Sequence, residues 1–137
     1  MGEIRVKVIL INSFDDALLS LGKITQDQVR RVEAEGIVDT GAVTCVLPQR
    51  IVDQLGVAIR GQRVANYADR ESKTVSVISP IIVEILDRNT IEDALIFGDE
   101  ILIGRTVLEK LDLVADCRNQ KVIPNPAHPD QQILNVR

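Results

Sequence analysis

The feature that most constrains this chain is an acidic residue, Asp39, that directly follows a segment of alternating apolar and polar residues. Between Val32 and Val38 every second residue is small or apolar, and two of the residues between them are glutamates. This pattern predicts a β-strand with one dry face. The next residues are Asp39-Thr40-Gly41-Ala42, in which glycine allows a tight turn and a close approach of backbone. The sequence therefore predicts a single carboxylate held at the end of a buried strand.

The composition indicates one β-rich domain. The chain has 137 residues, a common size for a single domain, and its 45% of apolar residues is enough for a core. Aromatic residues make up only 2%, so isoleucine, valine and leucine must fill that core. Because β-branched residues favour strands, we expect one all-β domain over residues 1–137, barrel-like, with one or two short helices.

Several classes of partner are disfavoured by charge and hydropathy. The net charge is -4 and the basic residues are scattered, which argues against nucleic acid. No apolar run approaches the roughly 20 residues of a membrane helix, so no membrane partner is expected. The first seven residues alternate charged with apolar side chains and do not form a signal peptide. Together with only two cysteines, this leads us to expect a cytoplasmic protein.

The cysteines have two interpretations. Cys45, Cys117 and His128 are potential metal ligands, but their spacing matches no common zinc pattern. Buried free thiols are the better interpretation, with His128 exposed and idle between two prolines. We therefore expect no metal and no cofactor.

The remaining elements follow from periodicity and from turn residues. Pro48 can begin a helix that runs to about Leu55 and stops at Gly56, and a second helix is predicted over Arg105–Leu111. Helical turns are expected at 15–22 and after Thr25, and a turn at 87–89. Further strands are expected at 4–11, 64–67, 73–78, 81–85, 95–97, 101–103, 114–115 and 121–123.

Three segments, in their order and spacing, resemble the retropepsin-like aspartic proteases, the single-domain relatives of pepsin. The first is Asp39-Thr40-Gly41-Ala42, which matches the family's active-site loop at all four positions. The second is Ile101–Arg105, an apolar segment ending in Gly104 before a helix. The third is the hairpin around 67–73, which lies between them where the family places its flap. Val43-Thr44 stand where viral members often carry two acids, so the cellular and bacterial members are the closer match.

This resemblance implies a symmetric homodimer, because the chemistry of the family needs two carboxylates and the chain encodes one. It also implies a catalytic function. It implies that Asp39 is catalytic, with Thr40 bonding across the dimer axis and Gly41 and Ala42 supporting the loop. It further implies that Ile103 and Gly104 cross this loop, and that Tyr67, Ala68 and Asp69 cover the substrate. The implied activity is aspartic-type endopeptidase: two acids share one proton and activate water against a peptide bond. The homodimer and a peptide or protein substrate are the expected partners.

Some alternatives stay open. A catalytically silent dimeric module that binds a peptide or protein on the same fold is a second hypothesis for the function. Tyr67 either bonds to the active site or simply packs on the hairpin. The hairpin tip at Asp69 is either a solvated turn or a contact for charged substrate side chains. Residues 132–136 form either an interface strand or a frayed terminus.

Overall fold

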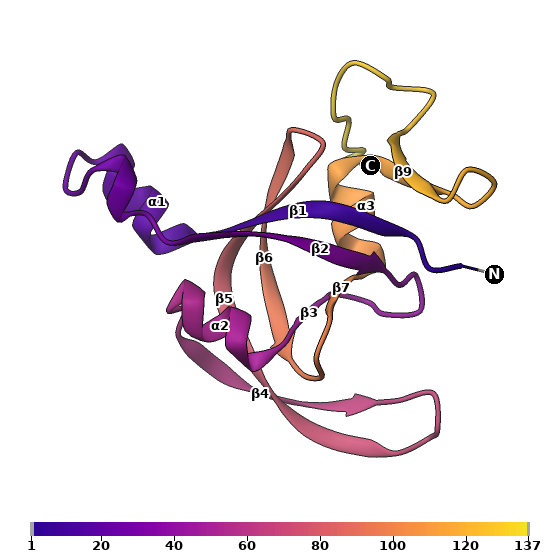
Figure 1. The fold of residues 1–137 in the computed structure, drawn as a ribbon, viewed down its shortest axis with the longest axis horizontal. Helices are drawn as coiled ribbons and strands as arrows, with labels where there is room; N and C mark the ends of the chain where they lie inside the picture. Colours follow the sequence, from indigo (N-terminus) through magenta and orange to yellow (C-terminus); the bar gives the residue numbers. More distant parts are fainter. Residues whose placement is uncertain (1, 137) are drawn as a thin grey trace.

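The computed structural model describes residues 2–136 (Figure 1), and the chain is mostly β with short helices. In chain order the elements are β1 (Arg5–Asn12), α1 (Ser13–Ser20), the 3₁₀ turn η1 (Gln26–Gln28), β2 (Arg31–Val38), β3 (Cys45–Leu47), α2 (Gln49–Leu55), β4 (Ile59–Asn66), β5 (Ser72–Ile85), β6 (Arg88–Ile96), β7 (Ile101–Ile103), α3 (Arg105–Leu111), β8 (Leu113–Asp116) and β9 (Lys121–Pro124).

Six strands close into a barrel in the order β1-β2-β7-β3-β6-β5, and β5 pairs with β1 to complete the ring. The pairings β2–β7 and β3–β6 are parallel, and the others in the ring are antiparallel. Among the described strands β4 pairs with β5 alone, and the hairpin that they form extends away from the barrel (Figure 1). The β-rich barrel expected from the sequence is confirmed, with three short α-helices where one or two were expected.

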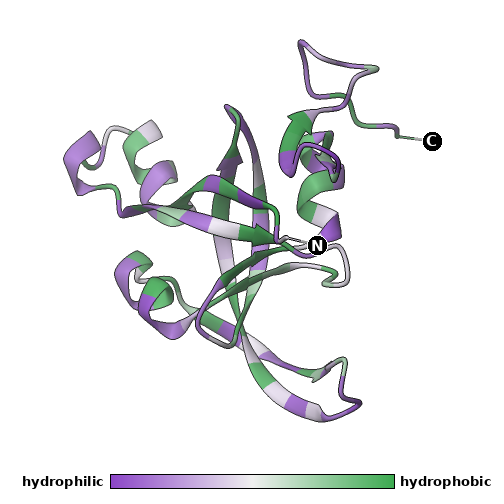
Figure 2. Cartoon of the chain, turned by 45° about the vertical axis from the view of Figure 1, so that its right-hand side comes forward, coloured by the Kyte–Doolittle hydropathy of each residue, from purple (hydrophilic) through white to green (hydrophobic). Residues whose placement is uncertain are grey.

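The core is aliphatic, as the composition predicts. Green, hydrophobic stretches run along the barrel strands in Figure 2. No aromatic ring is among the buried apolar residues of the described part of the chain. The largest fully buried apolar side chains are those of Leu10, Leu47, Leu55, Ile78, Ile81, Ile85, Ile103 and Leu111.

Helix α2 begins and ends close to where its sequence predicts. Pro48, predicted as the first helical residue, is the N-cap, so the helix begins one residue later, at Gln49. Ile51, Val52 and Leu55 are buried against the barrel. Gly56 has φ of +63°, a left-handed conformation that glycine adopts without strain and that ends the helix.

No helix within residues 2–136 combines the length and the apolar character needed to cross a membrane.

The turn predicted at 87–89 is misplaced. The chain reverses at Leu86 and Asp87, both with positive φ, and Arg88 already belongs to β6. The guanidinium of Arg88 reaches from β6 to the end of α3 and to the C-terminal segment. It donates to the carbonyl oxygens of Leu111 (3.1 Å), Asp112 (2.8 Å) and His128 (3.0 Å). The polar run 87–89, which indicates a turn, therefore contains a residue, Arg88, that links β6 to α3 and to the C-terminal segment.

His128 is neither exposed nor idle, which corrects the sequence interpretation. Its Nδ1 lies 2.7 Å from Oδ2 of Asp112, whose Oδ1 accepts from Asn125. The hydrogen bond from Asn125, together with one from the Ile133 amide and the His128 contact, lowers the pKa of Asp112 below its ordinary value. These bonds attach the C-terminal segment to the start of β8. Residues 132–136 are irregular chain, and Ile133 among them belongs to this anchor. The interface-strand interpretation remains a prediction.

An ion pair closes the excursion between β1 and β2, which carries α1 away from the barrel (Figure 1). Asp15 is 5% exposed. Its carboxylate accepts from the Arg30 backbone N–H (3.0 Å), from Nε (2.8 Å) and from Nη2 (3.0 Å). These contacts with the guanidinium lower the pKa of Asp15 below its ordinary value, against the opposing effect of burial.

We predict that Asp15→Asn lowers the free energy of unfolding by about 1–3 kcal/mol at neutral pH, because charged hydrogen bonds to Arg30 are lost. The pKa of Asp15 is lower in the folded than in the unfolded chain. Its contribution is therefore complete above about pH 4 and is lost as the pH falls through the folded value. Denaturant unfolding of both proteins at neutral and acidic pH measures the difference. Asp16→Asn, next along the helix, is the control, and a pH-independent difference between wild type and Asp15→Asn would contradict this account.

Candidate active site

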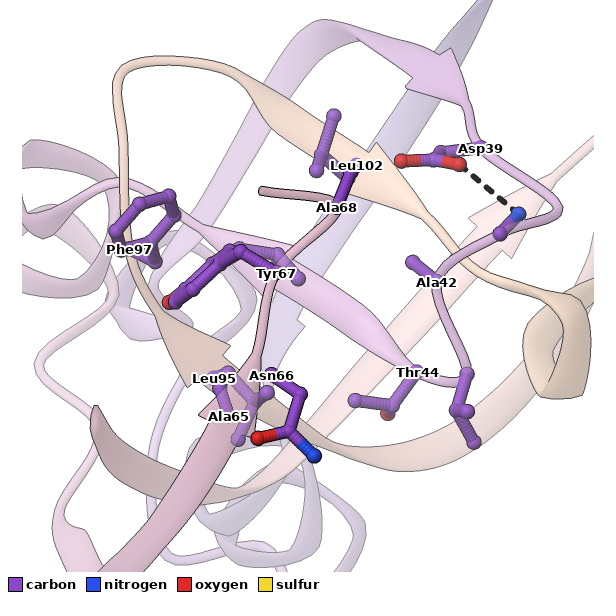
Figure 3. Close-up of a pocket in the computed structure, with 13 residues that line it drawn as sticks. Asp39, Ala42, Thr44, Ala65, Asn66, Tyr67, Ala68, Leu95, Phe97 and Leu102 are labelled. Carbon is purple, nitrogen blue, oxygen red and sulfur yellow. Dashed lines mark hydrogen bonds between the residues drawn. The ribbon is translucent and has the colours of Figure 1, made fainter. Parts of the chain in front are cut away.

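Asp39 lies at the carboxyl end of β2, where the sequence predicts it. Its backbone N–H donates to Ile103 O of β7 (3.0 Å), and its carbonyl oxygen accepts from the Ala42 N–H (3.1 Å). The Gly41 N–H donates to the side-chain oxygen Oδ1 of Asp39 at 2.9 Å (dashed in Figure 3). Within residues 2–136 no hydrogen bond reaches the other oxygen, Oδ2. The loop thus fixes the carboxylate by one oxygen and leaves the second available.

The loop after Asp39 is bound to the start of α3. Arg105 N donates to Ala42 O (2.9 Å) and Thr106 N to Val43 O (3.0 Å), and the Thr106 hydroxyl adds a bond to the same Val43 oxygen (2.8 Å). The first amides of a helix have no partner inside the helix, so these bonds satisfy both the helix and the loop. Helix α3 therefore fixes the loop that carries Asp39.

Gly104 permits this contact. A Cβ atom at Gly104 would lie 2.3 Å from Thr44 O and 2.8 Å from Ala42 O. The backbone of Gly104 has φ of −85°, which any residue can adopt, so space is the constraint. Ile103, the preceding residue, is fully buried and pairs with Val38 at the end of β2. The segment 103–104 therefore lies directly against the Asp39 loop.

A pocket of about 610 Å³ opens beside Asp39, within the size range of ligand sites. Asp39 is the one charged residue among the described residues that line it. Asp39 and the aromatic pair of Tyr67 and Phe97 lie toward opposite sides of it in Figure 3. Its lining is Asp39, Gly41, Ala42, Val43, Thr44, Val46, Ala65, Asn66, Tyr67, Ala68, Leu95, Phe97 and Leu102.

The hairpin supplies one wall of the pocket. Tyr67 packs on Phe97 from the end of β6, with ring centroids 4.6 Å apart and planes inclined by 34°. Lys73 Nζ lies 5.9 Å from the centroid of the Tyr67 ring and 5.8 Å from that of Phe97, within cation–π range. Of the two interpretations of Tyr67, packing is what the structure shows. The aromatic pair thus forms the wall distant from Asp39, and the Lys73 ammonium lies beside this wall, outside the pocket lining.

The other predicted site residues are placed as follows. Ala42 and Ala68 line the pocket, whereas Thr40 and Asp69 do not. Thr40 is exposed, and its carbonyl oxygen accepts a long 3.5 Å bond from Arg105. The Asp69 carboxylate accepts from the Glu71 N–H (2.9 Å) and closes the hairpin turn. Asp69 therefore shapes the hairpin and does not line the pocket.

Most of the apolar lining was not singled out from the sequence. Leu95 and Phe97 alternate along the end of β6, and Leu102 lies between the two buried isoleucines of β7. This alternation was a usable signal, since a residue between two buried ones points to the opposite face of the strand. Whether such an outward face of a strand lines a pocket depends on where the hairpin lies. The strand pattern alone therefore does not identify the site.

The cysteines provide no second reactive centre in this pocket. Cys45 is fully buried, and burial raises the pKa of its thiol to about 12, with a smaller contribution from the nearby Glu92 carboxylate. Such a thiol stays protonated at neutral pH and is a poor nucleophile. Cys117 is exposed, which corrects the expectation that both thiols are buried. Within residues 2–136 no cluster of three or more His, Cys, Asp or Glu side chains could hold a metal ion.

A scan against models of known protein families found none that matches this sequence, and a search of curated proteins found no match.

We predict that Gly104→Ala destabilises the protein by about 3 kcal/mol or more, since its methyl group would collide with backbone that the barrel holds in place. Gly61→Ala is the matched control, because a Cβ at Gly61 meets only an Arg63 side-chain atom at 3.6 Å. Thermal or denaturant unfolding measures both. Equal effects of the two substitutions would show that the close contact at Gly104 does not constrain the loop.

Proposed function

We propose that the protein is an aspartic endopeptidase in which Asp39 of two copies forms the catalytic pair of a homodimer. The observation that carries this proposal is the setting of Asp39. Its carboxylate is fixed through Oδ1 by the Gly41 amide, keeps Oδ2 without a partner among residues 2–136, and borders an apolar pocket of about 610 Å³. A charged group bordering a mostly apolar cavity with a few polar side chains is typical of a ligand site.

The chemistry needs a second carboxylate close to the first. Two such groups do not both ionise at short range, so the pair holds one proton and titrates as a unit. The ionised member takes a proton from water, and the protonated member donates a hydrogen bond to the scissile carbonyl oxygen. The loop of this chain would contribute one carboxylate to the pair, oriented by the Gly41 amide.

The surface of the Asp39 loop supports pairing with a second copy. Thr40 and Gly41 are exposed, and Val43, an apolar residue that lines the pocket, is 57% exposed. A two-fold axis beside this loop would bring two Asp39 residues together and cover both Val43 side chains. An isologous contact of this kind uses the same patch on both copies.

The hairpin supports a peptide as the substrate. Strand β4 is an edge strand with one described pairing, so its outer backbone groups remain available to an extended chain. Ala65 and Asn66 at its end already line the pocket. An extended peptide along this edge would place one of its side chains among the apolar residues and its backbone near Asp39.

We predict that Asp39→Asn abolishes cleavage of an unfolded protein substrate, a loss of at least about a thousandfold, and leaves the fold unchanged, because the amide cannot take a proton from water. Asp130→Asn, at an exposed position outside the pocket, is the matched control and should cleave normally. Peptide fragments resolved by mass spectrometry, together with circular dichroism, measure both properties. Undiminished cleavage by Asp39→Asn would exclude this mechanism.

We also predict that specific activity falls on dilution, because only the dimer holds two carboxylates. Activity per chain and particle mass by light scattering are measured across one dilution series, and the two curves should share a midpoint. A particle that keeps the mass of one chain at every concentration, while cleavage persists, would contradict a shared active site. Peptide binding without cleavage under all conditions would favour the silent binding module.

A further inference from the structure

The β4–β5 hairpin differs in charge from the rest of the molecule. Residues 59–78 contain four cations and two carboxylates, whereas the whole chain has a net charge of -4. The four cations are Arg60, Arg63, Arg70 and Lys73. None of them takes part in an ion pair within residues 2–136. The hairpin is thus a positive element on an acidic molecule.

Strand register places Lys73 on the pocket side of this hairpin. Ala65, which lines the pocket, is directly opposite Lys73 in the β4–β5 pairing. Opposite residues of an antiparallel pair point to the same face of the sheet. Arg63 is two residues before Ala65 and so shares that face, where its partner is the buried Val75.

The Lys73 ammonium lies over the aromatic wall of the pocket. It lies within 6 Å of the centroids of both Tyr67 and Phe97, two residues that line the pocket. It is exposed, so water solvates it and no described carboxylate neutralises it. Among residues 2–136 no cation lines the pocket itself, so this ammonium at the rim is available to an anionic group of a bound molecule.

We propose that Lys73 is a specificity-determining residue, which binds a carboxylate of the peptide when an apolar side chain of the same peptide fills the pocket. This inference rests on the proposed peptide-cleaving function and names its substrate class: peptides that combine an apolar residue with a nearby acidic group. Asp39 and the aromatic pair lie toward opposite sides of the pocket in Figure 3. The peptide carboxylate that binds Lys73 would therefore lie at a distance from the bond that is cleaved near Asp39. The carboxylate belongs to an acidic side chain or to the end of the peptide.

The test measures binding separately from cleavage, by using the full-length Asp39→Asn variant. The probes are acetylated and amidated peptides with one central leucine, in which a single glutamate is moved stepwise along both sides of it. Matched peptides carry glutamine instead, and one further peptide has no glutamate but a free C-terminal carboxylate. The chain has one tyrosine and no tryptophan, so its intrinsic emission reports on Tyr67, provided that the peptides lack both residues.

At one position or more, the glutamate peptide should bind about two- to fivefold tighter than its glutamine match, the range of an exposed ion pair. The preference should weaken with added salt. Lys73→Gln should abolish it, Lys73→Arg should keep it, and Lys121→Gln on the distant β9 should leave it unchanged. A preference for the free C-terminus alone would support the same site with the chain end as the source.

The proposal is overturned if glutamate and glutamine peptides bind equally at every position, if the preference survives Lys73→Gln, or if no peptide of the series binds. These outcomes are distinct from failure of the proposed function. Cleavage by the wild type without a glutamate preference would overturn the role of Lys73 alone. A glutamate preference without cleavage would remove the endopeptidase and leave Lys73 as the carboxylate site of a binding module.

Discussion

The arrangement of the site depends on the close contact between Gly104 and the loop that follows Asp39. In the sheet β7 lies between β2 and β3, and the loop 39–44 connects these two neighbours, so it must pass over the end of β7. A residue with a side chain at that end would occupy the space of the Thr44 and Ala42 carbonyl oxygens. Glycine removes the obstacle, and the first amides of α3 then bind the loop. The position of Asp39 is therefore a property of the barrel as a whole.

The barrel and the hairpin differ in how firmly they are held. The barrel strands enclose an aliphatic core with many fully buried side chains. The outer part of the hairpin has mostly exposed residues on β4, and it meets the end of β6 through the Tyr67–Phe97 ring pair and the Lys73 ammonium over the Phe97 ring. Segments with few buried contacts open at lower free energy than the core around them. Opening of the hairpin thus requires separation of Tyr67 from Phe97 but no disruption of the barrel, and this would admit an extended chain to the pocket.

Local patterns predicted the parts of the fold that local chemistry determines. The alternation before Asp39, the Pro48 and Gly56 limits of α2 and the apolar segment before Gly104 all identified real elements. The anchors made by Arg88 could not be predicted, because its partner His128 is 40 residues away in the chain. The role of Phe97 in the pocket wall could not be predicted either, because it depends on where the hairpin places Tyr67. Features that depend on residues close together in the sequence could be predicted, and contacts between residues that are close only in space could not.

Symmetry constrains how the proposed dimer would recognise a peptide. One chain supplies one carboxylate at Asp39 and one ammonium at Lys73, on different sides of the pocket. In an isologous dimer the two Asp39 residues meet near the axis, and the two Lys73 residues lie on opposite sides of it. An extended peptide that crosses the axis has a direction, whereas the dimer has none. An acidic residue before the scissile bond would then meet one Lys73, and an acidic residue after the bond would meet the other. Such a dimer selects the separation between the apolar and the acidic residue, and accepts the acid on either side of the bond.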